Sequence, residues 1–413
     1  MRKVELLAPA GDIEKLKFAY LYGADAVYIG GKNYSMRANA KNFSNEEIKE
    51  ACAIAHSLGK KLYVTVNIAF HNEDYEGLAT YLKCLESYGV DAIIVSDMAV
   101  VDLVKTEEIN LPIHISTQMS NANVCSVQFL KDLGVERVVL ARECSKEDIQ
   151  EIIQKTGIEI ECFLHGAMCS SYSGRCVLSN YFTGRDANRG GCAQICRWCF
   201  PLFCDDEKVE SDTKFTMSSK DLSLIGYLKE MIDIGITSLK VEGRMRSNYY
   251  IATVISTYRE AIDHIYENTY SDSLQEYYQK VLNRVANRES TDQFFHTFPS
   301  VEAQYYLGRQ EVSNQDFLGI VLDYDKESKM VTLTQRNYFK TGDRVEMFGP
   351  NIRAFSFTIL KIYNEKGEEI EVARHPEEIV KFYLDREVYP NDIMRVSLES
   401  KDGLEKNHEL LKS

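Results

Sequence analysis

The sequence predicts an α/β protein, in which a closed (β/α)8 barrel of the TIM type is followed by a small C-terminal all-β barrel domain. Three observations support this prediction. A unit in which a glycine directly precedes a short apolar strand recurs along about the first 250 residues. Amphipathic helical segments lie between those strands. From Phe317 onward, apolar and polar residues alternate between turn residues, as in antiparallel strands.

The repeated unit accounts for most of the barrel strands. Glycine after the last turn of a helix takes the left-handed conformation without steric cost, and the strands that follow are short and β-branched, as in a sheet covered on both faces. A strand at 4–8 and another at 113–116 bring the total to eight. The helix expected at 44–57 begins with a capping box. The repeats begin at Gly23, Gly59, Gly89, Gly134, Gly157 and Gly235.

A doubly wound open sheet is the alternative arrangement of such units. No G-x-G-x-x-G motif follows any predicted strand, so the closed barrel is favoured. We expect the barrel at 1–268 with a cysteine-rich insertion at 161–220, then a helical connector at 269–312, the β-domain at 313–400 and a polar tail at 401–413. The insertion separates strands seven and eight and is far longer than an ordinary connection, which is typical of a functional loop.

Composition restricts the classes of function. The chain of 413 residues has 45% hydrophobic residues and eleven cysteines. We expect neither a signal peptide nor a membrane span, because the N-terminus has only a short apolar run and no apolar run is long enough. Clustered cysteines without an export signal indicate the reducing cytoplasm. A net charge of −14 argues against nonspecific coating of nucleic acid, although a local basic patch could dock one structured RNA.

The segment 161–199 carries the chemistry. Cys169, Cys176, Cys192 and Cys196 have the spacing C-x6-C-x15-C-x3-C, with Cys199 two residues beyond, and glycines lie between them. Glycine lets the backbone turn tightly enough to bring distant thiolates together. We interpret this segment as a loop wrapped around a metal centre. Because it follows the seventh strand, we expect it over the mouth of the barrel, where barrel enzymes have their active sites.

Several interpretations of these cysteines were compared. Structural zinc usually takes two C-x2-C pairs, and only Cys196 and Cys199 have that spacing. An iron–sulfur cluster accepts irregular spacing and is favoured, with zinc as the alternative. The C-x3-C-x2-C triad that ends at Cys199 matches radical S-adenosylmethionine enzymes, but those enzymes resemble one another in placing it after the first strand. Unligated thiols are expected at Cys52, Cys84, Cys125 and Cys144.

Polar residues at the strand ends are the candidate catalytic groups. His165 precedes Cys169 by four residues and could be an acid–base group, a hydrogen-bond donor to a cluster sulfur or a structural histidine. Lys240, Glu242 and Arg244 alternate along and beyond the last strand, so all three could face the mouth or form a structural set of ion pairs. One further polar strand end, a candidate for substrate binding, is Asn67.

Four arginines are interspersed with the cysteines. A guanidinium group matches the geometry of carboxylates and phosphates, so these residues could bind an anionic substrate or RNA, or could neutralise a thiolate cluster. Trp198, the single tryptophan, could stack on a base or pack beneath the loop. The sequence has no G-x-S-x-G or H-E-x-x-H motif of known hydrolases. The four arginines are Arg175, Arg185, Arg189 and Arg197.

The segment from Glu161 to Ser179 resembles the signature of peptidase family U-32, the collagenase-like peptidases. That signature reads E-x-F-x2-G-[SA]-aliphatic-C-x4-G-x-C-x-aliphatic-S, and every fixed position agrees. The resemblance extends over the barrel, including LLAPAG near the start and SLKVEGRMRS at the eighth strand, and is expected to include the β-domain.

The resemblance implies a function. Several family members resemble oxygen-independent hydroxylation proteins that carry a four-cysteine [4Fe–4S] cluster and act on tRNA, ribosomal RNA or ubiquinone precursors. The continuation RDANRGGCAQICRW is similar to the branch that forms 5-hydroxyuridine at the tRNA wobble position and is linked to prephenate. The implied cluster ligands are Cys169, Cys176, Cys192 and Cys196, with Cys199 as the alternative fourth thiol. The implied partner is tRNA.

Three further possibilities stay open from the sequence. The protein could be a collagenase-like peptidase, or a zinc-stabilised RNA-binding module. It could also act as a homo-oligomer or with a paralogous partner chain. Under the favoured interpretation, the loop arginines and Lys240 would bind the carboxylates of prephenate or the RNA backbone.

Overall fold

The computed structural model describes residues 3–36, 41–210, 214–286, 288–306 and 316–398. The chain divides into two compact units. The first comprises Met1–Gln279 with Arg288–Gln310, and the second comprises Lys280–Asn287 with Glu311–Ser413. The expected polar tail at 401–413 lies outside the described residues.

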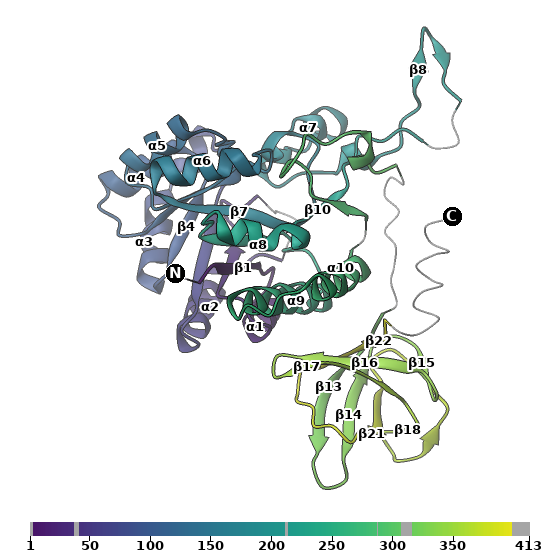
Figure 1. Cartoon of the computed structure of the whole chain (residues 1–413). Helices are drawn as coiled ribbons and strands as arrows, with labels where there is room; N and C mark the ends of the chain where they lie inside the picture. Colours follow the sequence, from purple (N-terminus) through teal and green to yellow (C-terminus); the bar gives the residue numbers. More distant parts are fainter. Residues whose placement is uncertain (1–2, 37–40, 211–213, 287, 307–315, 399–413) are drawn as a thin grey trace. The chain divides into compact units, whose positions relative to one another are not determined.

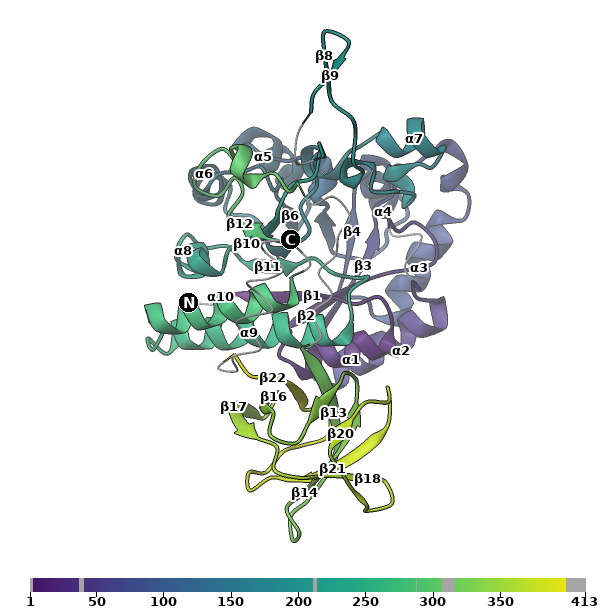
Figure 2. The ribbon, with the colours of Figure 1, turned by 90° about the vertical axis from the view of Figure 1, so that its right-hand side faces the viewer.

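The first unit is a closed barrel of eight parallel strands (Figures 1 and 2). Seven of them pair in chain order, and the last pairs with both the first and the seventh, which closes the ring. The predicted barrel and all eight of its strands are therefore confirmed. The strands are β1 (Glu5–Pro9), β2 (Ala26–Gly30), β3 (Lys61–Val66), β4 (Ala92–Val95), β5 (Ile113–Ile115), β6 (Arg137–Val139), β7 (Glu159–Gly166) and β11 (Ser238–Val241).

Helices follow the strands and surround the barrel (Figure 2). Ser44 and Glu47 form the predicted capping box at the start of α2, and Gly89 and Gly157 end α3 and α6 in the left-handed conformation. The helices are α1 (Ile13–Leu21), α2 (Asn45–Ser57), α3 (Leu78–Tyr88), α4 (Met98–Thr106), α5 (Val124–Asp132), α6 (Lys146–Thr156), α8 (Leu228–Asp233) and α9 (Asn248–Tyr266).

The interior of the barrel is divided between apolar and charged side chains. Residues of β1 to β4 form a buried apolar cluster that includes Leu7, Tyr28 and Tyr63. Residues of β6, β7 and β11 instead bring buried charges inward, and Arg137 there contacts Glu5, Glu159 and Glu161. Buried charges persist only when they are paired, so these contacts must form together as the barrel closes.

The insertion between β7 and β11 contains most of the short elements of this unit. Strand β10 returns antiparallel to β7 and pairs in parallel with β12, so part of the segment expected as a connector completes the barrel unit. The elements of the insertion are η3 (Tyr172–Gly174), α7 (Leu178–Thr183), η4 (Ala187–Arg189), η5 (Ile195–Arg197), β8 (Phe203–Cys204), β9 (Glu207–Lys208), β10 (Asp221–Ser223) and η6 (Ile225–Tyr227). The other short elements are η1 (Asn72–Tyr75), η2 (Thr117–Met119), β12 (Ser290–Thr291) and η7 (Val301–Ala303).

The second unit is the predicted antiparallel all-β domain. Helix α10 (Asp272–Val285) begins in the first unit and ends in the second, where Arg284 Nε lies 2.6 Å from the Asp316 carboxylate. The principal sheet has the order β17-β16-β22-β13-β14-β21-β18-β19, and it surrounds one apolar core that includes Leu333 and Phe382. Its strands are β13 (Phe317–Asp325), β14 (Met330–Gln335), β16 (Arg344–Gly349), β17 (Ile352–Thr358), β18 (Ile362–Asn364), β19 (Glu369–Ile370), β21 (Ile379–Tyr383) and β22 (Ile393–Val396), with β15 (Phe339–Lys340) and β20 (Val372–Ala373) pairing separately.

No helix among the described residues is both long and apolar enough to cross a bilayer.

Candidate active site

The cysteine loop leaves the barrel at the carboxyl end of β7. Gly166, the last residue of that strand, has φ +118°, and a Cβ atom there would lie 2.8 Å from the Cβ of Glu242. Only glycine fits this close crossing of two chain segments. The return strand is held nearby, since the Ser219 hydroxyl donates to the Met168 carbonyl at 3.3 Å. The loop therefore lies at the end of the barrel predicted for the active site.

The loop is fastened to the segments that follow three other strands. Arg189 forms a two-pronged ion pair with Asp74 beyond β3 and donates to the Ala69 carbonyl at 2.7 Å. Arg175 Nε donates to the Gln118 carbonyl beyond β5 at 2.5 Å. These contacts fix the loop over the barrel mouth.

A further attachment lies beyond β6. The Glu143 carboxylate accepts hydrogen bonds from both the backbone N–H and the hydroxyl of Ser173, at 2.7 and 2.8 Å. The adjacent Arg142 donates to the Ala167 carbonyl at 2.5 Å, and its guanidinium lies 3.7 Å from the centre of the Phe163 ring. Each of these contacts holds backbone that flanks Cys169 or Cys176.

Cys176 is positioned by the amide side chain of Asn188. The Asn188 Oδ1 atom accepts from the Cys176 N–H at 3.2 Å, and Asn188 Nδ2 donates to the Cys176 carbonyl at 2.9 Å. The Leu178 N–H points to Cys176 Sγ at 3.4 Å. A backbone N–H in this position can donate a hydrogen bond to a metal-bound sulfur.

Three of the four predicted ligand cysteines are electrostatic neighbours. The Cys196 thiol interacts with those of Cys169 and Cys192 and is hydrogen-bonded to Ser170, and burial is the main cause that raises its pKa. Cys169 Sγ lies 3.0 Å from the Ser171 hydroxyl. A bound cation would reverse the mutual repulsion of such thiolates.

The thiols of the loop are the kind of side chain that binds an iron–sulfur cluster, but they are not arranged as the ligands of a bound cluster. Among the residues that the structure describes, no group of three or more histidine, cysteine, aspartate or glutamate side chains is arranged to hold a metal ion. The thiols nevertheless share one fastened loop, and hydroxyl and N–H groups point at their sulfur atoms.

Lys240 points into the barrel and not toward the cysteines. Its ammonium lies 2.8 Å from Glu161 and 4.5 Å from the centre of the Tyr28 ring, and all three residues are buried. Burial lowers the pKa of Lys240. Arg244 lies nearer the mouth, where it donates to the Ser35 hydroxyl at 2.8 Å. Lys240 and Arg244 thus lie at different depths of the barrel interior, since Arg244 also lies 3.4 Å from the Thr65 hydroxyl.

His165 faces helix α9. Its Nδ1 atom lies 3.2 Å from the Tyr258 hydroxyl, and its ring packs on Tyr250 and Tyr258. Burial lowers the pKa of His165 to about 3, so the ring is neutral near pH 7. Cys169 has Ser171 as its polar contact, so the structure does not pair this cysteine with His165 as a nucleophile and base.

The other predicted residues differ in their surroundings. Asn67 supports the segment after β2, because its side-chain oxygen accepts from the Met36 N–H at 3.4 Å. Glu242 is half-buried, and its carbonyl accepts from the Tyr250 hydroxyl at 3.1 Å. Arg185 is exposed, whereas Arg189 is engaged with Asp74.

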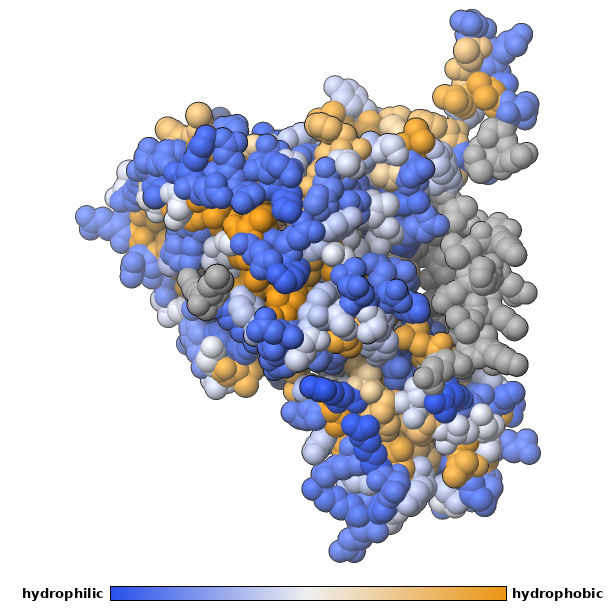
Figure 3. Space-filling view, in the orientation of Figure 1, coloured by the Kyte–Doolittle hydropathy of each residue, from blue (hydrophilic) through white to orange (hydrophobic). Residues whose placement is uncertain are grey.

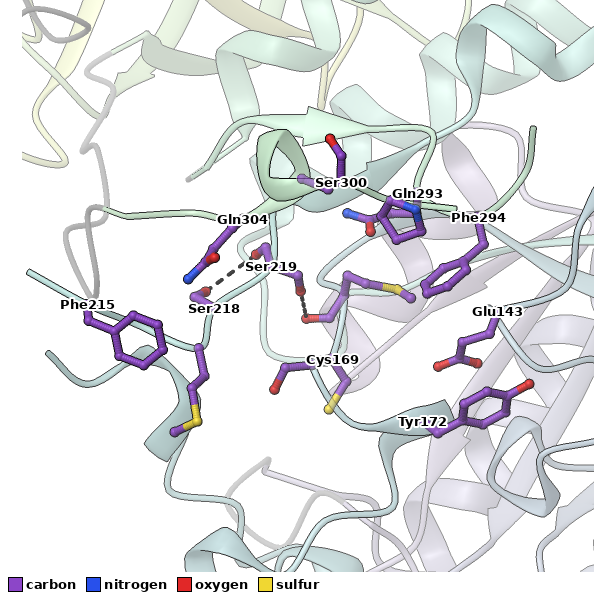
Figure 4. Close-up of a pocket in the computed structure, with 15 residues that line it drawn as sticks. Glu143, Cys169, Tyr172, Phe215, Ser218, Ser219, Gln293, Phe294, Ser300 and Gln304 are labelled. Atoms are coloured by element: carbon purple, nitrogen blue, oxygen red, sulfur yellow. Dashed lines mark hydrogen bonds between the residues drawn. The ribbon is translucent and has the colours of Figure 1, made fainter. Parts of the chain in front are cut away.

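A pocket of about 420 Å³ opens beside Cys169 (Figure 4). Its walls come from the start of the loop, the return to β10 and the segment after β12. Phe215 and Phe294 supply aromatic faces, and Gln293 and Gln304 supply amides. Such a mixture of rings and a few polar groups is typical of a small-molecule or nucleobase site.

Hydrophobic residues reach the surface of the loop on α7 and the β8–β9 hairpin (Figure 3), and several exposed side chains there are aromatic. Tyr181 is 85% exposed, and Phe182 and Phe203 are more than half exposed. Phe182 packs edge-on against Trp198, whose ring is half-buried. Exposed rings of this kind can stack on unpaired bases.

Comparison with known protein families decides the identity of the fold. The profile described as peptidase family U32 matches residues 11–305, and that of the peptidase family U32 C-terminal domain matches residues 313–395. The chain belongs to peptidase family U32. The predicted family is therefore confirmed over both units.

Some relatives of this U32 protein are named as tRNA hydroxylation proteins, and another is named as a collagenase. The tRNA hydroxylation protein P1 of Bacillus subtilis is 49% identical over 95% of both chains. The tRNA hydroxylation protein P of Escherichia coli is 34% identical over 90% of this chain and 92% of its own. A Porphyromonas gingivalis protein named collagenase is 34% identical over 70% and 73%. Among solved structures, the C-terminal domain of a Geobacillus thermoleovorans U32 peptidase is 49% identical, covering 19% of this chain and 98% of its own with a TM-score of 0.19.

The U32 barrel also contains a charged cluster that the sequence did not reveal. Asp221, at the start of β10, is paired with Arg288 and lies 3.9 Å from Arg246. Arg197 interacts electrostatically with all three, and burial is the main cause that lowers its pKa. Arg246 lies two residues beyond Arg244, a predicted site residue, and this position could have identified it from the sequence. Arg288 lies in the expected connector, where no pattern marked it.

Proposed function

We propose that the protein is a cytoplasmic enzyme that hydroxylates the wobble uridine of tRNA without molecular oxygen, forming 5-hydroxyuridine. The observation that carries this proposal is the position of Cys196 beside Cys169 and Cys192, on a loop held over the mouth of the barrel. The names of relatives similar over nearly the whole chain support tRNA as the substrate.

The proposed cofactor is a [4Fe–4S] cluster held by Cys169, Cys176, Cys192 and Cys196. When bound, such a cluster supplies one-electron transfer at a potential set by its hydrogen bonds and burial. The chain's own contribution is to fix the thiols. Asn188 holds the backbone of Cys176, and the Ser171 hydroxyl and Leu178 N–H point to the sulfurs of Cys169 and Cys176.

The reaction needs a donor of the hydroxyl group. Replacement of C5–H by C5–OH removes two electrons from the uracil. An organic alcohol R′–OH balances this change if R–H and R′–OH become R–OH and R′–H, so that the donor takes up the electrons and the proton. Prephenate, a secondary alcohol with two carboxylates, is the donor that we propose. Its carboxylates require cationic partners in the protein.

The pocket beside Cys169 is the proposed site for the base. Phe215 and Phe294 on its walls offer ring faces for stacking. Gln293 and Gln304 line it too, with their side-chain nitrogens donating to the Lys220 and Thr216 carbonyls. The exposed Arg175 and Arg185 and the aromatic residues of α7 would contact the surrounding RNA. Arg189 instead acts by holding the loop.

The test combines metal and nucleoside analysis. Anaerobically purified protein is expected to contain about four irons and four sulfides per chain. A deletion strain, also lacking any paralogue, is expected to lose 5-hydroxyuridine derivatives from its tRNA and to regain them with the wild type but not with Cys176→Ala. Unchanged tRNA in the deletion strain would refute the proposal. Zinc without iron or sulfide would favour a zinc-stabilised RNA-binding module.

A further inference from the structure

The cluster around Asp221 holds more positive charge than its own acid can balance. Arg288 Nη2 donates to Asp221 Oδ1, and Arg246 Nη2 lies 3.9 Å from Asp221 Oδ2. Arg197 interacts electrostatically with Asp221, Arg246 and Arg288. Three guanidinium groups therefore face one carboxylate in a place with little water.

Arg288 has hydrogen-bonding capacity that the described part of the protein leaves unused. Its side chain is only 4% exposed, yet Nε and Nη1 have no hydrogen-bond partner among the described residues. An unpaired buried N–H costs about 1–3 kcal/mol, and more on a charged group. Buried polar groups in proteins nearly always have a partner, so these N–H groups can donate to a bound water or ligand.

Nearby acids have other partners. Glu289 lies 2.6 Å from the ammonium of Lys220. Glu242 lies in the electrostatic surroundings of His165 and Tyr250. Arg246 shares these surroundings with Glu242, so the unused hydrogen-bonding capacity of the cluster is that of Arg288.

The cluster also lies beside the cysteine loop. Asp221 begins β10, whose next residue, Leu222, pairs with Gly166 at the carboxyl end of β7. Arg246 follows the end of β11, and Arg197 directly follows Cys196. A ligand bound by these arginines would thus lie near the proposed cluster ligands, at the mouth of the barrel.

We propose that Arg197, Arg246 and Arg288 form a binding site for a small dicarboxylate, with Asp221 orienting Arg288. This inference rests on the proposed function, in which the hydroxyl donor carries two carboxylates, and it assigns that donor a place. Guanidinium groups bind planar carboxylates through paired N–H groups. The burial of Arg288 favours a small molecule over the phosphates of a folded RNA, which need an open surface.

The single tryptophan provides the measurement. Trp198 follows Arg197, so its fluorescence should report a ligand at the cluster. Metal-free protein without tRNA is titrated with prephenate, with phenylpyruvate as a related monocarboxylate, and with inorganic phosphate and a short RNA. We expect saturable binding of prephenate, at least about 10-fold tighter than phenylpyruvate or phosphate. Calorimetry of the same titrations checks the fluorescence.

Two variants and one control complete the test. Arg246→Gln, at a partly exposed position, and Arg288→Lys are each expected to weaken prephenate binding by about 10- to 100-fold. Arg259→Gln removes an arginine that pairs with Asp25 and Asp263 on another side of the barrel, and should leave the affinity unchanged. Thermal melting establishes that each variant is folded.

Three results would overturn the inference. Prephenate could fail to bind, or could bind equally well to the wild type and Arg246→Gln. Equal or tighter binding of phosphate or RNA at the cluster would assign it to phosphate instead. These titrations use neither tRNA nor metal, so their result does not depend on the nucleoside analysis that tests the proposed function. Intact prephenate binding with unchanged tRNA in the deletion strain would refute only the proposed reaction.

Discussion

The ammonium of Lys240 lies 2.8 Å from the carboxylate of Glu161 inside the barrel, and neither side chain reaches solvent appreciably. Glu161 also accepts from Arg137 at 3.2 Å, which links strands β6, β7 and β11 through charge. The first residue of the family signature thus has a structural partner on the strand that closes the barrel.

Removal of one member of this pair should strongly destabilise the fold. Lys240→Met leaves the Glu161 charge with only Arg137, and loss of one partner of a buried ion pair typically costs about 3–5 kcal/mol. Lys229→Met removes an exposed ion pair with Asp233 and should cost less than about 1 kcal/mol. Urea unfolding measures both. Equal effects would show that the buried pair adds nothing beyond a surface pair.

Stability should fall as the pH drops below 6.5, in part through His165. Its pKa is about 3 in the folded protein, because of burial and then the charge of Arg246, so only the unfolded chain takes up this proton between pH 6.5 and 3. Stability present above pH 6.5 is therefore lost on acidification, by about 2 kcal/mol between pH 7 and 5.

The control for this prediction is His165→Gln. Glutamine does not titrate, so its unfolding free energy should change less over the same pH interval. His114, which is buried and also has a lowered pKa, gives a similar contribution in both proteins. A pH dependence identical to that of the wild type would mean that His165 is accessible to protons in the folded state.

The fourth cluster ligand should be Cys196 rather than Cys199. The Cys196 thiol is half-buried, interacts with Cys169 and Cys192, and is hydrogen-bonded to Ser170. Cys196→Ala is expected to lose most of the iron and sulfide, and Cys199→Ala to retain them. Anaerobic iron and sulfide analysis of both variants decides the assignment, and the reverse result would place the cluster toward Cys199.

Arg185 and Arg189 should affect tRNA in different ways. Arg185→Ala removes an exposed charge, so tRNA binding should weaken. The slope of log K against log salt concentration should become shallower by the amount that about one phosphate contact contributes. Arg189→Ala breaks the pair with Asp74, whose pKa the hydrogen bonds from Arg189 lower to about 2. We expect faster proteolysis of the cysteine loop and little change in the salt slope.

Titration of tRNA binding at several salt concentrations, with limited proteolysis of each variant, tests this distinction. Lys229→Ala, on helix α8, is a matched control for a lost surface charge. If Arg189→Ala lowered the salt slope as much as Arg185→Ala, Arg189 would be an RNA contact.

The barrel could be predicted from the sequence because its signals are local. Most barrel helices end at or just before a glycine, as α3 does at Gly89 and α6 at Gly157, and each strand is a short apolar run. The clustered cysteines likewise share one segment. These features depend on neighbours in the chain, which a sequence displays directly.

The directions of side chains and the contacts between residues far apart in the chain could not be predicted from the sequence. Alternation grouped Lys240, Glu242 and Arg244, but it could not show that Lys240 pairs with Glu161 and Arg244 with Ser35. Arg288 and Asp221 are 67 positions apart and meet only because β12 pairs with β10. No periodicity in the sequence encodes such a meeting.

The antiparallel pairing of β10 with β7 has a consequence for the proposed metal centre. Both ends of the cysteine loop are joined by backbone hydrogen bonds, with Leu222 opposite Gly166 and Ser223 opposite His165. The entropy of closing this long loop is therefore lost when the barrel folds and not when metal arrives. Chelation should leave an intact barrel that can be reloaded repeatedly, unlike a zinc finger, which unfolds without its ion.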